Sequence, residues 1–185
     1  AAESAVDIGC SRLEKQAEDE LFFHVFSPPP GIIIGGAVHI AQPLAAMACL
    51  MDYRCTIIDP RTAFATEQRF PGVNLIVEHT KTALEKIEWH PGAAVVALSH
   101  SPQLDDPLLI HAIKAGAGYI GALGSKKTHA DRLGRLRKAG LTNGQLERIR
   151  GPVGLDIGSR TPSEIALSIL AEITHYRRKR ERSAR

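Results

Sequence analysis

Short, nearly continuous apolar runs alternate along most of the chain with longer segments in which apolar residues recur every three or four positions. The runs predict strands, and the longer segments predict amphipathic helices. The predicted strands are 32–34, 55–59, 75–77, 93–98 and 118–123, and the predicted helices are 40–51, 80–87, 104–113, 125–138 and a last helix from 161 onward. Strands that are apolar on both faces are typical of a parallel sheet covered by helices on both sides. We therefore predict an α/β fold with a doubly wound, mainly parallel sheet and Rossmann-like topology.

Residue types at the starts of two predicted helices match helix-capping patterns. Thr80 is expected to cap the helix 80–87. The run Thr161-Pro162-Ser163-Glu164 forms a capping box with proline at the first helical position. The apolar spacing of this last helix predicts its buried face, made of Ile165, Ile169, Leu170 and Ile173.

The first 27 residues differ in texture from the rest of the chain. Residues 1–20 are polar and suggest no more than a short helix, whereas 21–26 predict a short strand. The run Ser27-Pro28-Pro29-Pro30 predicts a stiff linker. We therefore divide the chain into an N-terminal extension, 1–27, and a Rossmann-like domain, 28–185, that ends in a basic helix.

The bulk composition fits one globular domain. The chain has 185 residues, of which 44% are hydrophobic and 23% are charged, and its net charge is +3. The last ten residues contain five arginines and one lysine, which suit the negative end of a helix dipole. A nucleic-acid tail is the less favoured interpretation, because no recognition motif accompanies the run.

The cysteines and the hydropathy exclude several classes of protein. Cys49 and Cys55 are expected to be small core residues, and Cys10 is a candidate free thiol. The spacing of the three fits neither a zinc site nor a disulfide framework. The chain has no secretory signal and no apolar stretch of 18 residues, so we expect a cytoplasmic protein without a membrane span.

The predicted fold places ligands beyond the carboxyl ends of the strands, where the strand order reverses. That point is expected between the first and fourth predicted strands of the domain. It brings Gly36–His39 and Ser99-His100 into one crevice.

Phosphate binding is the first chemistry that this crevice suggests. Gly36, Ala37, Val38 and His39 lie between a strand and a helix, where small residues and free N–H groups attract phosphate. Asp59, 23 positions after Gly36, is a candidate for binding a ribose hydroxyl. The dinucleotide fingerprint is incomplete, because Val38 stands at its second glycine. A tight turn without ligand is the alternative, and we expect Gly36→Val to block ligand binding more than it lowers stability.

Two neighbouring segments offer further polar groups. Arg61 either contacts a phosphate or forms an ion pair within its loop, and Ser99 and His100 follow the fourth strand. His100 is the candidate general base or ligand. Asp105 and Asp106 are explained as favourable acids at a helix start. A metal site made of His39, His100 and Asp105 has no spacing signature, and no metal is predicted.

Two glycine-containing segments could add anion contacts. Gly121, Gly124, Ser125, Lys126 and Lys127 form either an anion cradle or a capped helix with solvated lysines. The segment 154–161, with Asp156 and Thr161, also suits an anion, although capping alone explains Thr161.

Taken in order, these segments resemble the C-terminal Rossmann-type domain of the XdhC/CoxI family of accessory proteins. The resemblance runs from about Pro28 to Tyr176. The runs that carry it are Gly36-Ala37-Val38-His39-Ile40-Ala41, Asp59-Pro60-Arg61, Arg69-Phe70-Pro71, Leu104-Asp105-Asp106-Pro107, Tyr119-Ile120-Gly121-Ala122-Leu123-Gly124-Ser125, Gly154-Leu155-Asp156-Ile157-Gly158 and Thr161-Pro162.

The resemblance implies binding of the molybdenum cofactor, as molybdopterin or its dinucleotide form. It also implies help in sulfurating the cofactor and inserting it into a xanthine or carbon monoxide dehydrogenase. The implied partner is a molybdenum hydroxylase client. A cysteine desulfurase is a further candidate partner, and a homo-oligomer is compatible with the sequence.

The chain departs from the family pattern at three places. Much of the family has glycine where Val38 stands. The usual Thr-His-Asp-x-Lys run appears here as Ser99-His100-Ser101-Pro102-Gln103, which removes an acid and a cation. Longer members also have an N-terminal domain with a Gly-Cys motif, which we do not assign to Gly9-Cys10.

The leading hypothesis is therefore an accessory protein that handles the cofactor rather than an enzyme with its own turnover. An NAD(P)-dependent oxidoreductase is the alternative that the fold alone favours. A binding module that kept the fold and lost the ligand is the third.

Overall fold

The computed structural model describes residues 12–16, 19–24, 29–90 and 92–183. Its main body is a six-stranded sheet in the order β5-β4-β3-β6-β7-β8, in which every pairing is parallel. The strands are β3 (Gly31–Gly35), β4 (Arg54–Ile58), β5 (Asn74–Ile76), β6 (Ala94–Ala97), β7 (Tyr119–Ala122) and β8 (Ile149–Arg150). The order reverses between β3 and β6, the first and fourth strands of this sheet. The predicted doubly wound Rossmann-like fold is confirmed.

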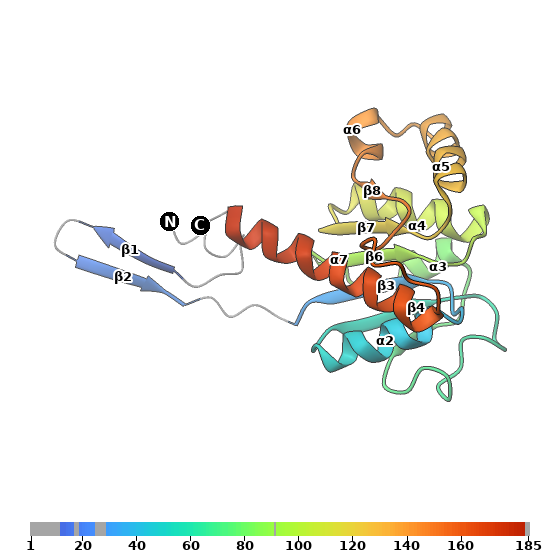
Figure 1. Cartoon of the computed structure of the whole chain (residues 1–185), viewed down its shortest axis with the longest axis horizontal. Coiled ribbons are helices and arrows are strands. Elements are labelled where there is room, and N and C mark those ends of the chain that lie inside the picture. The colour runs from blue at the N-terminus through green and yellow to red at the C-terminus, as the bar shows by residue number, and fades with distance from the viewer. Residues whose placement is uncertain (1–11, 17–18, 25–28, 91, 184–185) are drawn as a thin grey trace.

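Helices cover both faces of the sheet (Figure 1). They are α2 (Ala41–Leu50), α3 (Thr80–Leu84), α4 (Pro102–Lys114), α5 (Lys126–Lys138), α6 (Asn143–Leu146) and α7 (Pro162–Ser183). Successive side chains of β3 point to opposite faces, so Ile32 and Ile34 belong to one apolar cluster and Ile33 to the other. The first cluster includes side chains from α2 and α7, and the second includes side chains from α3, α4, α5 and α6.

Helix α7 begins as its sequence predicts. The backbone N–H of Glu164 donates to Thr161 Oγ1 at 3.3 Å, and the backbone N–H of Thr161 donates to Glu164 Oε2 at 2.9 Å. These two bonds satisfy N–H groups that a helix end leaves free. On the predicted buried face, Ile169, Leu170 and Ile173 are buried, and the fourth member, Ile165, is half-buried.

Two smaller predictions were wrong. Thr80 does not cap α3, because the helix begins at Thr80 itself and His79 stands at the cap position; Thr80 is buried instead. Cys49 is exposed, whereas Cys55 is buried as expected. Cys49 lies in the last turn of α2, at the edge of the buried face of the helix to which Ala45 and Ala48 belong.

The N-terminal extension contains a two-stranded antiparallel sheet of β1 (Arg12–Gln16) and β2 (Asp19–Phe23). The expected short helix is therefore wrong for 12–16 and 19–20, while the predicted strand is confirmed at 21–23. Cys10 and the predicted boundary between residues 27 and 28 lie outside the described residues. Among the helices of the described part, none combines the length and apolar character needed to cross a membrane.

The capping box supplies a test of what Thr161 does. Thr161→Ala should lower the free energy of unfolding by about 1 kcal/mol, because the N–H of Glu164 loses its acceptor. Thr161→Ser should retain most of the stability. Urea unfolding followed by circular dichroism measures both. Equal stability of Thr161→Ala and the unchanged chain would show that the cap contributes nothing and would leave Thr161 free for a ligand.

Candidate functional site

The ends of β3 and β6 approach each other closely at the point where the strand order reverses. Leu98 donates its backbone N–H to Gly35 at 2.8 Å, and Gly36 donates its own to Ile58 at the end of β4. Gly36 has a φ of +105°, and a Cβ added there would lie 2.9 Å from the Cα and N atoms of Ser99. Gly36 is therefore required for packing and for backbone conformation. This changes the expectation for Gly36→Val, whose side chain would meet Ser99 and lower stability directly.

Asp59 follows β4 and is fully buried. Its Oδ2 accepts the backbone N–H of Ala37 at 2.7 Å and Nη2 of Arg61 at 2.6 Å, and its Oδ1 accepts the backbone N–H of Arg61 at 2.9 Å and its Nε at 2.8 Å. Burial raises the pKa of Asp59, but the bonds from Arg61 and Ala37 outweigh burial and hold that pKa below its usual value. Of the two roles considered for Arg61, the loop ion pair is present in the structure.

The turn before α2 leaves backbone donors open. Ala41 donates to the carbonyl of Val38 at 3.0 Å, and the helix has neither a side-chain cap nor an acid in its first turn. Within the described residues, the N–H groups of Val38, His39 and Ile40 have no acceptor. His39 is exposed, and the other two are half-buried. Free N–H groups and the positive end of the helix dipole favour an anion at this place.

The loop after β4 brings a second arginine to the start of α2. Arg69 donates from Nη2 to Gln42 Oε1 at 3.3 Å, and Gln42 lies in the first turn of α2. Arg69 also donates from Nη1 to the carbonyl of Phe64 at 2.6 Å, and its guanidinium carbon lies 5.5 Å from the centre of the Phe64 ring. Both hydrogen-bond acceptors are neutral, and no acidic partner of Arg69 is found among the described residues. Sequence reasoning noted Arg69 only as part of a motif and gave it no role.

The loop after β6 is held by a buried acid. Asp105 Oδ1 accepts Ser99 Oγ at 2.6 Å, and Ser99 Oγ accepts the backbone N–H of Ser101 at 3.1 Å. Asp105 Oδ2 lies 3.8 Å from Nη2 of the buried Arg132, which donates to the carbonyl of Leu123 after β7. Burial raises the pKa of Asp105 despite the bond from Ser99 and the nearby Arg132.

The view of Asp105 and Asp106 as simple helix-start acids therefore needs correction. Asp105 connects the loops that follow β6 and β7, and Asp106 forms a two-pronged pair with Arg135 at 2.7 and 3.1 Å. Between Ser99 and Ser101, His100 is exposed and has a φ of +61°. That backbone region is uncommon for any residue other than glycine, and histidine is among those that tolerate it.

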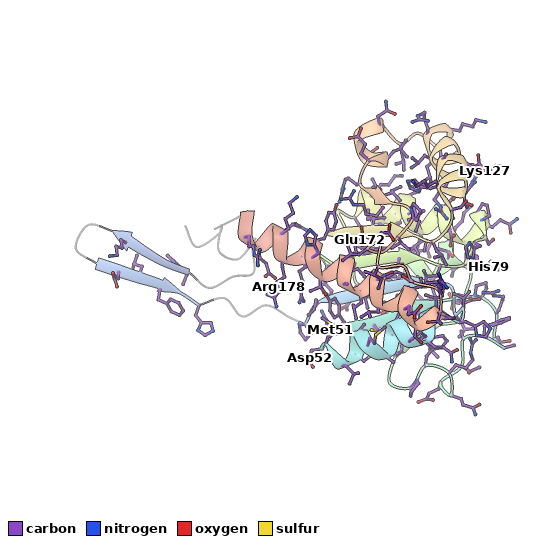
Figure 2. All side chains as sticks on the ribbon, viewed as in Figure 1. Met51, Asp52, His79, Lys127, Glu172 and Arg178 are labelled. Carbon is purple, nitrogen blue, oxygen red and sulfur yellow. The ribbon has the colours of Figure 1, made fainter. Side chains whose placement is uncertain are left out.

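Among the described residues, those of the glycine-containing segment 121–127 form no hydrogen bond with the turn before α2. Gly121 is buried in β7, where a Cβ would lie 2.4 Å from Val153, so its role is packing. Ser125 caps α5 by accepting the N–H of Thr128 at 3.1 Å, and Gly124 has a φ of +140°. Lys126 and Lys127 are exposed on the first turn of α5. Figure 2 shows Lys127 at the same edge of the molecule as His79, which follows β5.

The last candidate segment lies between β8 and α7. Gly154 donates its N–H to Glu172 Oε2 at 2.8 Å, which fixes the start of the loop against α7. Asp156 is exposed, and Thr161 is engaged in the capping box. The cap explains Thr161 without a ligand, and an anion contact by Asp156 or Thr161 stays a prediction.

Two hollows accompany the sheet. One of about 430 Å³ lies between the first turns of α3 and α4 and is lined by His79, Thr80, Lys81, Pro102, Gln103, Asp106, Pro107 and Ile110. Another of about 560 Å³ lies at the opposite edge, beside the first residues of β3, β4 and β5.

In the part of the chain that the structure describes, no three His, Cys, Asp or Glu side chains are grouped as metal ligands, and His39, His100 and Asp105 form no such group.

Comparison with known proteins places this geometry in a family. A family model described as the XdhC Rossmann domain matches residues 32–173. The chain is 31% identical over 160 residues to a Bacillus subtilis protein named as a probable subunit of xanthine dehydrogenase, and the match covers 86% of this chain and 46% of that protein. It is 32% identical over 152 residues to the molybdenum cofactor insertion chaperone PaoD of Escherichia coli, with 82% and 42% covered.

A solved structure agrees with these relatives. The crystal structure of a protein described as a xanthine dehydrogenase from Bacillus halodurans superposes with a TM-score of 0.74 at 30% identity. The match covers 85% of this chain and 45% of that one. The chain thus spans less than half the length of each of these relatives.

The close approach of β3 and β6 gives a prediction with an internal control. Gly36→Ala should lower the free energy of unfolding by about 1–3 kcal/mol more than Gly72→Ala. Both glycines have a positive φ, but a Cβ at Gly72 meets nothing within 4 Å, whereas one at Gly36 meets Ser99. Denaturant unfolding of the two variants measures the difference. Equal losses would mean that the contact with Ser99 relaxes at no cost.

Proposed function

Because this chain belongs to the XdhC family, we propose that it is an accessory protein that binds the molybdenum cofactor. In this role it assists sulfuration of the cofactor and its insertion into a molybdenum hydroxylase of the xanthine or carbon monoxide dehydrogenase type. The resemblance to a protein named a molybdenum cofactor insertion chaperone supports the proposal. The chain spans less than half of that relative, and the part of the role that we propose for this domain is binding of the cofactor.

The open anion site at the start of α2 is the observation that carries the proposal. The pterin cofactor is anionic through its phosphate, or through the pyrophosphate that joins it to a nucleoside in its dinucleotide form. The free N–H groups of Val38, His39 and Ile40 suit such a group, and Arg69 adds a positive charge at the same helix end. His39 is exposed beside these donors, where its imidazole can contact the ligand.

The alternatives predict different ligands. An NAD(P)-dependent oxidoreductase would bind a nicotinamide cofactor and turn over a small alcohol or acid, with His100 as its acid or base. A binding module that lost its ligand would bind neither. The fold is compatible with an oxidoreductase. Val38, at a glycine position of the dinucleotide fingerprint, counts against that activity.

Direct retention of the cofactor tests the proposal. Purified chain is mixed with freshly released molybdenum cofactor and separated by gel filtration, and the protein fraction is assayed for molybdenum and pterin. We expect both in the protein fraction, with less retained at high salt because phosphate attraction is screened. Empty protein fractions together with NADH binding and substrate turnover would overturn the proposal in favour of the oxidoreductase. Empty fractions without either would favour the ligand-free module.

Replacement of Arg69 tests the position of the phosphate. Arg69→Ala should weaken cofactor binding by about tenfold, because a charge-assisted contact of about 1.4 kcal/mol is lost. Lys138→Ala removes the same charge from the exposed last turn of α5 and should leave binding unchanged. Retained cofactor is measured as above, and thermal unfolding checks that each variant is folded. Equal binding by both variants would place the phosphate elsewhere, with Lys126 and Lys127 as the next candidates.

A further inference from the structure

The position of Asp59 is where dinucleotide-binding domains hold a ribose. In such domains an acid at the end of the second strand accepts the hydroxyl groups of the adenosine ribose. Asp59 follows β4, the second strand of the parallel sheet, and its bond to Ala37 places it beside the turn that faces the pyrophosphate in those domains. The chain therefore has the acid, but other donors occupy the acceptor sites that a ribose would use.

We propose that Arg61 closes this subsite and makes the chain select against ligands that are held through a nucleoside ribose. The ligand class is then an organic phosphate bound through its phosphate end. This inference rests on the proposed function for the identity of that ligand, but the exclusion of ribose is a separate property that can be measured alone.

The capacity of the carboxylate to accept hydrogen bonds is the first argument. An ionised carboxylate has about four lone-pair sites. Asp59 uses both oxygens for two donors each, all between 2.6 and 2.9 Å, from Ala37 and Arg61. A ribose hydroxyl could bond to Asp59 only by displacing one of them. The donor of Ala37 belongs to the turn backbone, so the side chain of Arg61 would have to leave.

The surroundings of Arg61 hold it in place. Its guanidinium carbon lies 4.4 Å from the centre of the Phe64 ring, a distance at which a cation is attracted to an aromatic face. The carbonyl of Arg61 accepts the backbone N–H groups of Phe64 at 2.9 Å and Ala65 at 3.1 Å, so a turn fixes the ring above the cation. Arg69 bonds to the carbonyl of Phe64 and to Gln42, which ties this turn to α2.

The charges at this edge also favour a phosphate over a ribose. A free carboxylate attracts hydroxyl donors, whereas the Asp59–Arg61 pair is neutral as a unit. Arg69, which bonds to Gln42 in the first turn of α2, has no acidic partner within the part of the chain that the structure describes. The edge therefore attracts a phosphate while offering no acceptor to the sugar beside it.

Binding of ADP-ribose, NADH and NADPH to the full chain tests the inference by calorimetry. We expect no binding at ligand concentrations up to about 1 mM, which corresponds to a dissociation constant above that concentration. Arg61→Ala frees the carboxylate and should bring the dissociation constant for ADP-ribose below about 0.1 mM, at least tenfold under the limit that the unchanged chain does not reach. Adding Asp59→Asn to that variant should abolish the gain. Arg61→Lys, which keeps a charge near Asp59, should gain less than Arg61→Ala.

Three outcomes would overturn the inference. The unchanged chain could bind ADP-ribose or NADH, with that binding lost in Asp59→Asn. It could also bind NADPH, with that binding lost when Arg61 is replaced. A folded Arg61→Ala variant could also gain no affinity, which would assign the exclusion to another feature. Arg61→Gln replaces Arg61→Ala if the latter does not fold, as judged by thermal unfolding. Cofactor retention in the same preparation tests the proposed function independently, so failure of one is distinguishable from failure of the other.

Discussion

The hydrogen bonds to the buried carboxylate of Asp59 are the interaction on which the carboxyl edge of the sheet depends. A buried anion is tolerated only where donors surround it, and here the donors come from the turn after β3 and from Arg61. The same bonds fix the turn that directs the chain into α2, with Gly36 bonded to Ile58 beside them. Removing the carboxylate would leave the Arg61 guanidinium and the backbone N–H groups of Ala37 and Arg61 without this acceptor.

At the carboxyl edge of the sheet, some polar groups have hydrogen-bond partners and others do not. After β4 the acid Asp59 is paired with Arg61, and after β6 the loop is bonded to Asp105, which lies 3.8 Å from Arg132; Nη2 of Arg132 donates to the carbonyl of Leu123 after β7. At the start of α2, by contrast, consecutive N–H groups have no acceptor, and Arg69 has only neutral ones. Free N–H groups at a helix start favour an anion, so we expect a ligand to bind at the start of α2.

The sequence predicted most of the sheet because β3, β6 and β7 are apolar or glycine throughout and β4 is interrupted only by Arg54 and Thr56. It missed β8, since Ile149–Arg150 is too short to show periodicity. It also missed β1, which is mostly polar, and predicted only the apolar end of β2. At the site, residue types suggested the crevice, but the partners of Arg61 could not be decided. Whether Arg61 binds a phosphate or Asp59 depends on how the Asp59 carboxylate is oriented. That orientation depends on a hydrogen bond from the backbone N–H of Ala37, 22 positions before Asp59.

Other errors have the same origin. Thr80 is a suitable cap by type, but the cap is set by where the first helical turn begins, and tertiary packing decided that. The small size of Gly36 suggested space for a phosphate, whereas the space that a side chain at this position would take is filled by the backbone of Ser99. Asp105 lies in the first turn of α4, as a favourable acid would, yet its partner Arg132 is on the next long helix. Contacts between distant segments are not visible in local patterns.

The claim that the start of α2 is an anion site is tested most directly by nuclear magnetic resonance of ¹⁵N-labelled chain titrated with inorganic phosphate. We predict saturable shifts of the amide signals of Val38, His39 and Ile40, which fade as sodium chloride is added. Unchanged signals at these three residues, with saturable shifts at 125–128 instead, would contradict the account and move the anion site to the start of α5.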